Sequence, residues 1–521
     1  MYFQPKRYNN YMRRLKKILA SRMWILALLV LMQAALLLLG IYRAALAYSL
    51  TGLINLLALF LAIYVINKDE DSSYKIGWCF LILAMPLIGS VLFLLCFGRK
   101  MPKRLANGTI EADARMRGLL EQDPAIKEQL QHDHPHINKI FAQSLRISGF
   151  PIYQNTAVTY FNSGEEFFPV FLEELRKAKQ FIFLEYYIIS NGYLWDQTLE
   201  ILKQKVAEGV EVKVIYDDFG CALGLPRKYD RYLNSLGIEA YRFNRIRPAL
   251  LITMNNRDHR KICVIDNETG FTGGLNLSDE YINKVNLYGY WRDSAVMVKG
   301  EAVRTMTLMF LGMYSYLKKD ESEIDYSRYL PHKSCVGKPD TYYQPFSDTP
   351  TDEADIGLSI HANLVNYAKK YIYIDTPYLV LNNDMMSALC RAAHSGVDVR
   401  ILVPKVPDKK TVYQITQSNF AKLIRSGVRI YKYTPGFNHR KNIVCDDEVC
   451  LVGSLNTDYR SYFMQFESGI LIRDTELAAH LRECFEQGLC ESEEVTEEQC
   501  RKTNLVVRMF RGVLNLLAPL F

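Results

Sequence analysis

Two stretches of the chain repeat one arrangement of side chains that could act on a phosphate. Each has a histidine, a lysine two positions later and an aspartate beyond a short apolar run. The six residues are His259, Lys261, Asp266, His439, Lys441 and Asp446. Residues two apart on a β-strand project from one face, so each histidine and lysine can meet the same phosphate. Histidine can attack phosphorus or move a proton, and lysine can neutralise phosphoryl oxygens, so the pattern predicts phosphodiester chemistry without a metal.

A glycine-containing turn and an asparagine follow each copy at equal distances. The first turn leads to Asn276 and the second to Asn456. Glycine permits a tight turn, and the asparagine amide can donate a hydrogen bond to the same phosphoryl oxygens. A fold has no need for histidine, lysine and asparagine at matched offsets twice, so we interpret the two copies as parts of one site.

The elements around the two copies also repeat. Each half has a β-branched and aromatic strand, a helical pattern, and two more short strands that begin after a glycine. The matching stretches are residues 179–187 with 370–378, 209–215 with 396–402, and 237–241 with 427–431. Strands that alternate with helices and glycine turns predict an α/β fold, with a sheet flanked by helices in each half.

The motif HxKxxxxD, followed by GG or GS and then xN, resembles the phospholipase D superfamily over roughly residues 150–490. The strings Tyr-Trp-Arg-Asp at 290–293, Thr-Pro-Tyr at 376–378 and Asp-Tyr-Arg-Ser at 458–461 are similar to bacterial cardiolipin synthases. The resemblance implies two tandem phospholipase D-like domains and no cofactor. It also implies that His259 is the nucleophile, forming a phosphohistidine, and that His439 is the general acid and later the base. The near symmetry of the halves permits the reverse order.

The remaining site residues are predicted by chemical role. Phosphate binding is expected of Lys261, Lys441, Asn276 and Asn456. A neutral histidine needs its second nitrogen held by a carboxylate or carbonyl, and Asp293 and Glu467 are the candidates. Asp266 and Asp446 are counted with the catalytic motif, although their place at the ends of apolar strands favours a structural role in the following turn. Glu185 and Asp375, in the first repeated strand, are left outside the site.

The resemblance implies a reaction between two lipids. Phosphatidyl transfer from one phosphatidylglycerol to another would give cardiolipin and glycerol, with phosphatidylglycerol and other anionic phospholipids as partners. Two alternatives stay open: a membrane-bound phosphodiesterase of the same superfamily that uses water, and a protein that binds anionic lipids without catalysis. Nucleic acid is not expected, because the soluble part has no dense basic stretch interleaved with aromatics. The oligomeric state is not predicted.

Three apolar runs near the N-terminus predict a membrane anchor. They cover residues 23–41, 45–66 and 76–97, and each is about as long as a helix that crosses a bilayer. Basic residues flank both the first and the third run, and both flanks favour the cytoplasmic side. Two to three crossings are compatible with this pattern. We expect a multi-pass protein of the cell membrane with cytoplasmic catalytic domains, since the 11 scattered cysteines suit a reducing compartment.

Length and composition complete the predicted organisation. A chain of 521 residues exceeds one hydrophobic core, and a net charge of +7 suits an anionic partner. We predict an anchor over residues 1–105, a linker over 106–149, the first domain over 150–335 and the second over 336–495. Residues 496–521 interleave basic and apolar side chains. This basic amphipathic segment could lie at an anionic membrane or pack on the domain.

Overall fold

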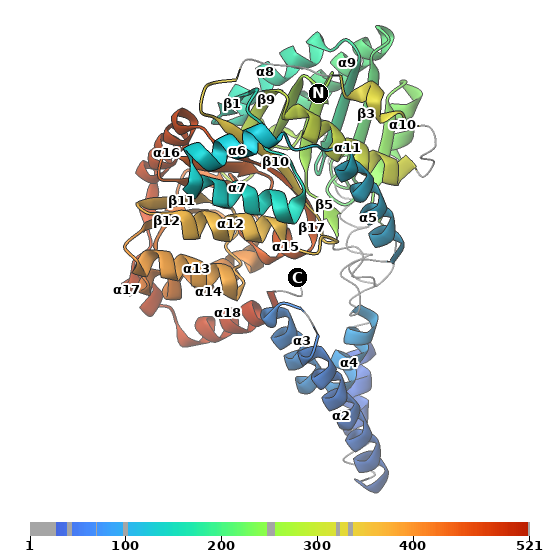
Figure 1. Cartoon of the computed structure of the whole chain (residues 1–521). Coiled ribbons are helices and arrows are strands. Elements are labelled where there is room, and N and C mark those ends of the chain that lie inside the picture. Colours follow the sequence, from blue (N-terminus) through green and yellow to red (C-terminus); the bar gives the residue numbers. More distant parts are fainter. Residues whose placement is uncertain are drawn as a thin grey trace. The chain divides into compact units, whose positions relative to one another are not determined.

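The computed structural model describes residues 28–38, 44–68, 70–96, 103–246, 256–318, 324–331 and 337–518. The chain divides into two compact units. The first comprises Met1–Lys100, Ile246–Met254 and Leu516–Phe521, and the second comprises Met101–Arg245 and Asn255–Asn515. In the described residues the first unit is helical, and every strand belongs to the second (Figure 1).

The described part of the first unit includes the apolar helices α2 (Ala44–Ile66), α3 (Ser72–Ala84) and α4 (Pro86–Cys96), and residues 28–38 are also helical. Asp71 begins α3 by accepting hydrogen bonds from the backbone of Ser73, at 2.8 Å, and of Tyr74. The third predicted run is two helices rather than one. Proline disfavours the helical conformation in the residue before it, and Met85 accordingly leaves the helix at φ −134° before Pro86 begins α4.

The predicted membrane crossings are not confirmed. Among the helices of the described residues, none is both long enough and apolar enough to cross a membrane. Both ends of the first predicted run, residues 23–27 and 39–41, lie outside the described residues.

The first half of the second unit is built on a seven-stranded sheet with the order β1-β9-β7-β6-β2-β3-β4. Strands β2, β3 and β4 are parallel, and the other neighbours are antiparallel. The bounds are β1 Thr156–Phe161, β2 Phe181–Tyr186, β3 Glu211–Asp217, β4 Glu239–Phe243, β6 Lys261–Ile265, β7 Thr269–Gly273 and β9 Ala295–Gly300.

The second half repeats this order as β10-β17-β16-β15-β11-β12-β13, with β18 added at the edge. The bounds are β10 Tyr342–Asp348, β11 Tyr371–Asp375, β12 Asp398–Pro404, β13 Arg429–Tyr433, β15 Asn442–Cys445, β16 Val449–Gly453, β17 Gln465–Arg473 and β18 Ser492–Glu494. The repeat seen in the sequence is therefore a repeat of topology, and the prediction of an α/β sheet in each half is confirmed.

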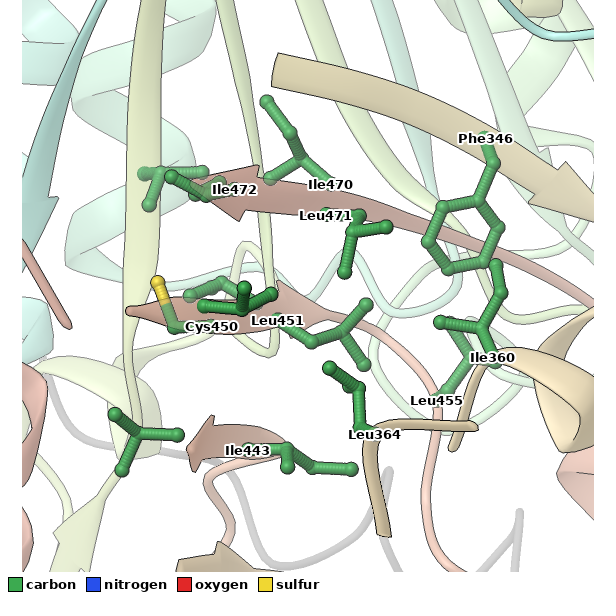
Figure 2. Close-up of a cluster of buried hydrophobic side chains, with 14 of the residues drawn as sticks. Phe346, Ile360, Leu364, Ile443, Cys450, Leu451, Leu455, Ile470, Leu471 and Ile472 are labelled. Carbon is green, nitrogen blue, oxygen red and sulfur yellow. The ribbon is translucent and has the colours of Figure 1, made fainter. Parts of the chain in front are cut away.

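Helices cover both sheets. The described helices after residue 150 are α8 Gly164–Lys177, α9 Tyr193–Ala207, α10 Tyr229–Ser235, α11 Val303–Lys318, α12 Ile356–Tyr367, α13 Asn383–His394, α14 Lys410–Arg425, α15 Tyr459–Phe463, α16 Thr475–Cys490, α17 Glu497–Arg501 and α18 Leu505–Leu517, with short 3-10 turns at Asp279–Ile282 and Tyr326–Tyr329. The last two, α17 and α18, bury no residue. Figure 2 shows Ile360 and Leu364 of α12 against Leu451 of β16 and Phe346 of β10. Every residue of β17 is buried, as expected for a strand covered on both faces.

The segment predicted as a linker, residues 106–149, is folded. It lies in α5 (Lys103–Gly118), α6 (Pro124–Asp133) and α7 (Pro135–Ser148), whose buried side chains join the main hydrophobic core. On α7, Ile137, Ile140 and Phe141 are buried at helical spacing. The apolar residues of α7 recur at helical spacing, so the sequence contains the signal of a helix. The many charged residues of α5, together with Pro124 and Pro135, instead give the segment the average composition of a linker.

Two short parallel strand pairs connect the halves. β5 (Arg257–Asp258), from the first half, pairs with β17 of the second, and β14 (Gly436–Asn438), from the second half, pairs with β8 (Tyr290–Arg292) of the first. Each pair lies immediately before one of the two motif histidines. The halves therefore exchange the segments that position the site.

Candidate active site

His259 lies between strands that belong to different sheets. β5 ends one residue before it, and β6 begins two residues after it. Its backbone N–H donates to the carbonyl oxygen of Phe466 on β17, at 2.9 Å. The next residue on β17 is Glu467, and both of its carboxylate oxygens lie 3.0 Å from His259 Nδ1. The second half therefore supplies the carboxylate that holds the histidine of the first.

His439 repeats this arrangement in the opposite direction. Its backbone N–H donates to the carbonyl oxygen of Arg292 on β8, at 2.8 Å. Asp293 follows, and its Oδ2 lies 2.6 Å from His439 Nδ1. Both predicted carboxylates thus contact histidines, each one across the boundary between the halves. The sequence indicated the two carboxylates but not which histidine each would hold.

Both imidazoles are held neutral with one nitrogen directed away from the carboxylate. A carboxylate at Nδ1 favours the tautomer with its proton there, which leaves a lone pair on Nε2. Burial, followed by the charge of Lys441, lowers the pKa of His439 to about 3. Burial and the charges of Lys261 and Lys441 lower the pKa of His259 well below its usual value. At neutral pH each histidine can therefore act as a nucleophile or a base.

The two motif lysines lie in the same buried cluster. Lys261 is 1% exposed and Lys441 2%, and each ammonium group donates to the backbone carbonyl of its own histidine. Burial lowers the pKa of Lys261 to about 7 and that of Lys441 to about 8. The charge of each lysine also lowers the pKa of the histidine in the other half. Two histidines and two lysines from distant parts of the chain therefore converge.

The two carboxylates have different surroundings. Glu467 accepts hydrogen bonds from the hydroxyls of Ser454, at 2.5 Å, and Ser461, at 2.7 Å, and burial raises its pKa to about 7. Asp293 accepts the backbone N–H of Ser294 at 2.8 Å. Burial alone would raise the pKa of Asp293, but the charge of Lys441 and the hydrogen bond from His439 outweigh it and the pKa falls below its usual value. Asp293 is thus the carboxylate better suited to face an imidazolium.

The difference between the GG and GS turns follows from the two carboxylates. Gly274 and Ser454 occupy equivalent positions, and a β-carbon at Gly274 would lie 2.0 Å from Oδ1 of Asp293. The longer Glu467 leaves room for the Ser454 hydroxyl, which then supports it. Sequence reasoning missed the supporting roles of Ser454 and Ser461, although both residues stand inside the motif strings and could have been paired with a nearby carboxylate.

The two asparagines lie beside the cluster in unequal settings. Asn276 accepts the backbone N–H of Ile188 at 3.0 Å and donates to the Tyr281 hydroxyl at 2.6 Å. The equivalent oxygen of Asn456, its buried Oδ1, has no hydrogen-bond partner in the described part of the chain. Asn276 therefore supports the loop after β2, and phosphate binding by either asparagine stays a prediction.

Asp266 and Asp446 are not brought to the histidines. Each lies at the far end of its strand, roughly 20 Å of extended chain from the histidine. Each carboxylate instead accepts three backbone N–H groups before the first strand of its half, those of Lys179, Gln180 and Phe181 for Asp266, and of Lys369, Lys370 and Tyr371 for Asp446. Both aspartates have φ near +55°. The prediction that they are catalytic is therefore corrected: both have a structural role. Each joins the end of its own strand to the start of β2 or β11, and does not stabilise the turn that follows it.

Glu185 and Asp375 form buried ion pairs behind the site. Glu185 accepts a hydrogen bond from Arg260 at 2.5 Å. Asp375 accepts one from Arg292, at 2.7 Å, and one from Asn438, at 3.0 Å. Asn438 directly precedes His439, and the carbonyl oxygen of Arg292 accepts the backbone N–H of His439. Because Asp375 binds both Asn438 and Arg292, it helps to fix the backbone of the histidine. Arg292 is a positioning residue that the sequence string Tyr-Trp-Arg-Asp contains without revealing its role.

Aromatic side chains enclose His439 more fully than His259. The ring of His439 lies 5.6 Å from Tyr281, 5.2 Å from Trp291 and 5.5 Å from Phe437, measured between centroids. His259 has Tyr187 at 5.0 Å. Aromatic faces stabilise a nearby cation and keep water away, so an imidazolium at His439 is favoured once it forms.

The cluster can therefore perform phosphoryl transfer with side chains alone. It offers two imidazoles held by carboxylates, and two ammonium groups that can neutralise phosphoryl oxygens. Within the described ranges, no group of three or more His, Cys, Asp or Glu side chains is arranged to hold a metal ion.

Comparison with known proteins agrees with this geometry. Residues 171–302 and 362–489 match the family described as "Cardiolipin synthase, PLD-like domain", and residues 56–98 match the family described as "Phospholipase_D-nuclease N-terminal". The two segments of the first match each contain one motif histidine, lysine and asparagine.

Relatives match along most of the chain. An uncharacterized protein of Streptococcus mutans is 38% identical over 88% of this chain and 99% of its own. A cardiolipin synthase of Alkalihalophilus pseudofirmus is 32% identical over 96% of this chain and 99% of its own. The crystal structure of a phosphatidylserine synthase from Haemophilus influenzae covers 74% of this chain and all of its own, with a TM-score of 0.56 at 16% identity, which shows a shared fold. With two motif copies on one repeated fold and such relatives, the chain belongs to the cardiolipin synthase family of the phospholipase D superfamily.

Proposed function

We propose that the protein is a cardiolipin synthase that transfers a phosphatidyl group between two phosphatidylglycerol molecules. The observation that carries this proposal is the reciprocal pairing of His259 with Glu467 and of His439 with Asp293, beside two buried lysines. The cardiolipin synthases to which the chain is similar support the choice of substrate.

In the first step, Nε2 of His259 attacks the phosphorus of one phosphatidylglycerol. The P–N bond forms, the bond from phosphorus to the glycerol headgroup oxygen breaks, and His439 gives its proton to that oxygen. His439 is neutral in the free site and takes up this proton from solvent when the substrate binds, because the anionic phosphate beside the lysines offsets the charges that lower its pKa. The ionised Asp293 then stabilises the imidazolium.

In the second step, the neutral His439 takes a proton from the headgroup hydroxyl of another phosphatidylglycerol. The hydroxyl oxygen attacks phosphorus, the P–N bond breaks, and cardiolipin leaves with His259 restored. One phosphodiester replaces another, so no nucleotide is needed. Water must be excluded from the phosphohistidine, and the aromatic rings around His439 support transfer over hydrolysis.

We also propose that the apolar N-terminal runs hold the enzyme at the cell membrane, with the second unit on the cytoplasmic side. Nine cysteines in the described residues are free thiols, and most of them are buried, which suits a reducing compartment. Membrane placement gives the enzyme access to both lipids.

Thin-layer chromatography of labelled phosphatidylglycerol, incubated with the full chain in mixed micelles, tests the function. We expect cardiolipin and glycerol in equal amounts, with no product from His259→Ala. His394→Ala, an exposed histidine at the end of α13, serves as the matched control and should retain activity. Phosphatidic acid as the sole lipid product would make the protein a hydrolase, and unchanged substrate would favour a lipid-binding protein.

The lysine pKa values predict how binding of a phosphate analogue depends on pH. The ammonium forms attract the anion, and they are lost as pH rises through about 7 for Lys261 and about 8 for Lys441. Because deprotonation removes charge next to the anion, we expect the Kd of tungstate to rise at least about ten-fold between pH 7 and 9. Calorimetric titration would measure it.

The control for this measurement is Lys203→Met, a surface lysine on α9, which should leave the profile unchanged. Lys261→Met and Lys441→Met should each weaken binding at pH 7 and flatten the rise. A Kd that does not change with pH would show that the two lysines do not hold the anion.

A further inference from the structure

The C-terminal helix α18 turns its apolar face away from the second unit. Most of its large apolar side chains are exposed, among them Leu505 by 68%, Val506 by 72%, Met509 by 66%, Phe510 by 56% and Val513 by 47%. Leu514, Leu516 and Leu517, toward its C-terminal end, are half-buried. An amphipathic helix of a globular domain normally buries this face. On α18 the orientation is reversed.

The polar face attaches the helix to the fold. Arg511 donates from Nε to Gln414 at 2.8 Å and from Nη2 to Gln417, both on α14. Arg508 and Asn515 share this side of the helix at spacings of three and four residues from Arg511. The outward direction of the apolar face is therefore set by hydrogen bonds on the opposite face.

The charge of this segment fits an anionic lipid surface. Residues 501–518 contain four basic side chains, Arg501, Lys502, Arg508 and Arg511, and no acidic one. An apolar helix face bordered by arginine and lysine is the pattern that lies in the plane of a bilayer, with the apolar side chains among the upper acyl chains and the cations at the phosphates.

We propose that α18 lies in the surface of an anionic phospholipid bilayer and holds the second unit against it. The active site lies on the same connected part of the fold. α14 begins at Lys410, and the charge of its neighbour Lys409 adds to the effects of burial and of the motif lysines on His259. A membrane contact through α18 would thus keep α14 and the site beside the lipid. Only this last consequence rests on the proposed function.

Quenching by brominated phosphatidylglycerol tests the contact. Phe510→Trp and Asn515→Trp place one added indole on the apolar and polar faces of the same helix, in the full chain reconstituted into vesicles. The wild type, with its 4 tryptophans, supplies the background. We expect the added emission of Phe510→Trp to fall at least about two-fold, and that of Asn515→Trp by much less.

Equal quenching at both positions, or none at either, would overturn the proposal, and the latter would indicate that protein rather than lipid covers the face. Equal quenching of Phe510→Trp by brominated phosphatidylcholine would overturn the preference for anionic lipid. Quenching does not require turnover, so it is informative even if the proposed transferase activity fails. In vesicles, the double variant Phe510→Ser with Val513→Ser should lower transfer about ten-fold, with micelle activity unchanged.

Discussion

His259→Ala and His439→Ala are both expected to lower transfer from phosphatidylglycerol by about 10⁴-fold, but only one of the losses should depend on the leaving group. Glycerol is a poor leaving group and needs a proton, whereas p-nitrophenolate does not. On a p-nitrophenyl ester of phosphatidic acid, His439→Ala should therefore still release a stoichiometric burst of nitrophenol. His259→Ala should release none, because no P–N bond can form.

Stopped-flow absorbance measures this burst, and protein denatured with dodecyl sulfate at mildly alkaline pH, where a P–N bond survives, should carry the phosphatidyl label in His439→Ala. The near symmetry of the two halves makes the comparison decisive. A burst from His259→Ala and none from His439→Ala would reverse the roles of the two histidines. A burst from both, or from neither, would contradict a division into nucleophile and acid. The exposed His394→Ala again serves as the control for folding and handling.

Replacing either carboxylate by its amide, Glu467→Gln or Asp293→Asn, is expected to lower kcat by about 10² to 10⁴-fold with little change in KM. An amide can present its N–H₂ group to Nδ1 and favour the wrong imidazole tautomer, as the loss on making the same change in serine proteases illustrates. Both carboxylates are fully buried, so water cannot substitute for them.

The two amide variants should differ on the p-nitrophenyl substrate. Asp293→Asn impairs the acid, so the burst should survive. Glu467→Gln impairs the nucleophile, so the burst should slow in proportion to kcat. Ser454→Ala, which removes one hydrogen bond to Glu467 and leaves the carboxylate in place, is the matched control and should cost less than about ten-fold. Equal behaviour of the two amide variants on both substrates would show that each carboxylate does not act through the histidine it contacts.

The exchange of carboxylates makes the two halves interdependent. The pairs His259–Glu467 and His439–Asp293 join residues 208 and 146 positions apart. β5 and β14 place each histidine next to the strand that carries its partner carboxylate. Each motif histidine takes its carboxylate from the other half, so one active site, rather than two, follows from the topology.

The sequence alone determined the parts of this protein that depend on local periodicity. Alternation along a strand puts His259 and Lys261 on one face, and the same spacing at His439 and Lys441 identified the repeat and an α/β sheet in each half. The residue types also identified Asp293 and Glu467 as the carboxylates. The motif residues lie within a few residues of one another or recur at equal intervals, so they can be read along the chain, whereas Asp293 and Glu467 stand at unequal distances from the histidine of their own half.

Only the tertiary structure decided which carboxylate holds which histidine, because that pairing depends on how two sheets pack and on strands exchanged between them. It also showed that Asp266 and Asp446 are structural rather than catalytic. Both lie in a turn with positive φ, and their carboxylates accept backbone N–H groups at the start of a neighbouring strand. The folded helices α5–α7 and the outward face of α18 were decided in the same way. An amphipathic pattern shows that a helix has an apolar face, but the hydrogen bonds and packing of its neighbours determine where that face points.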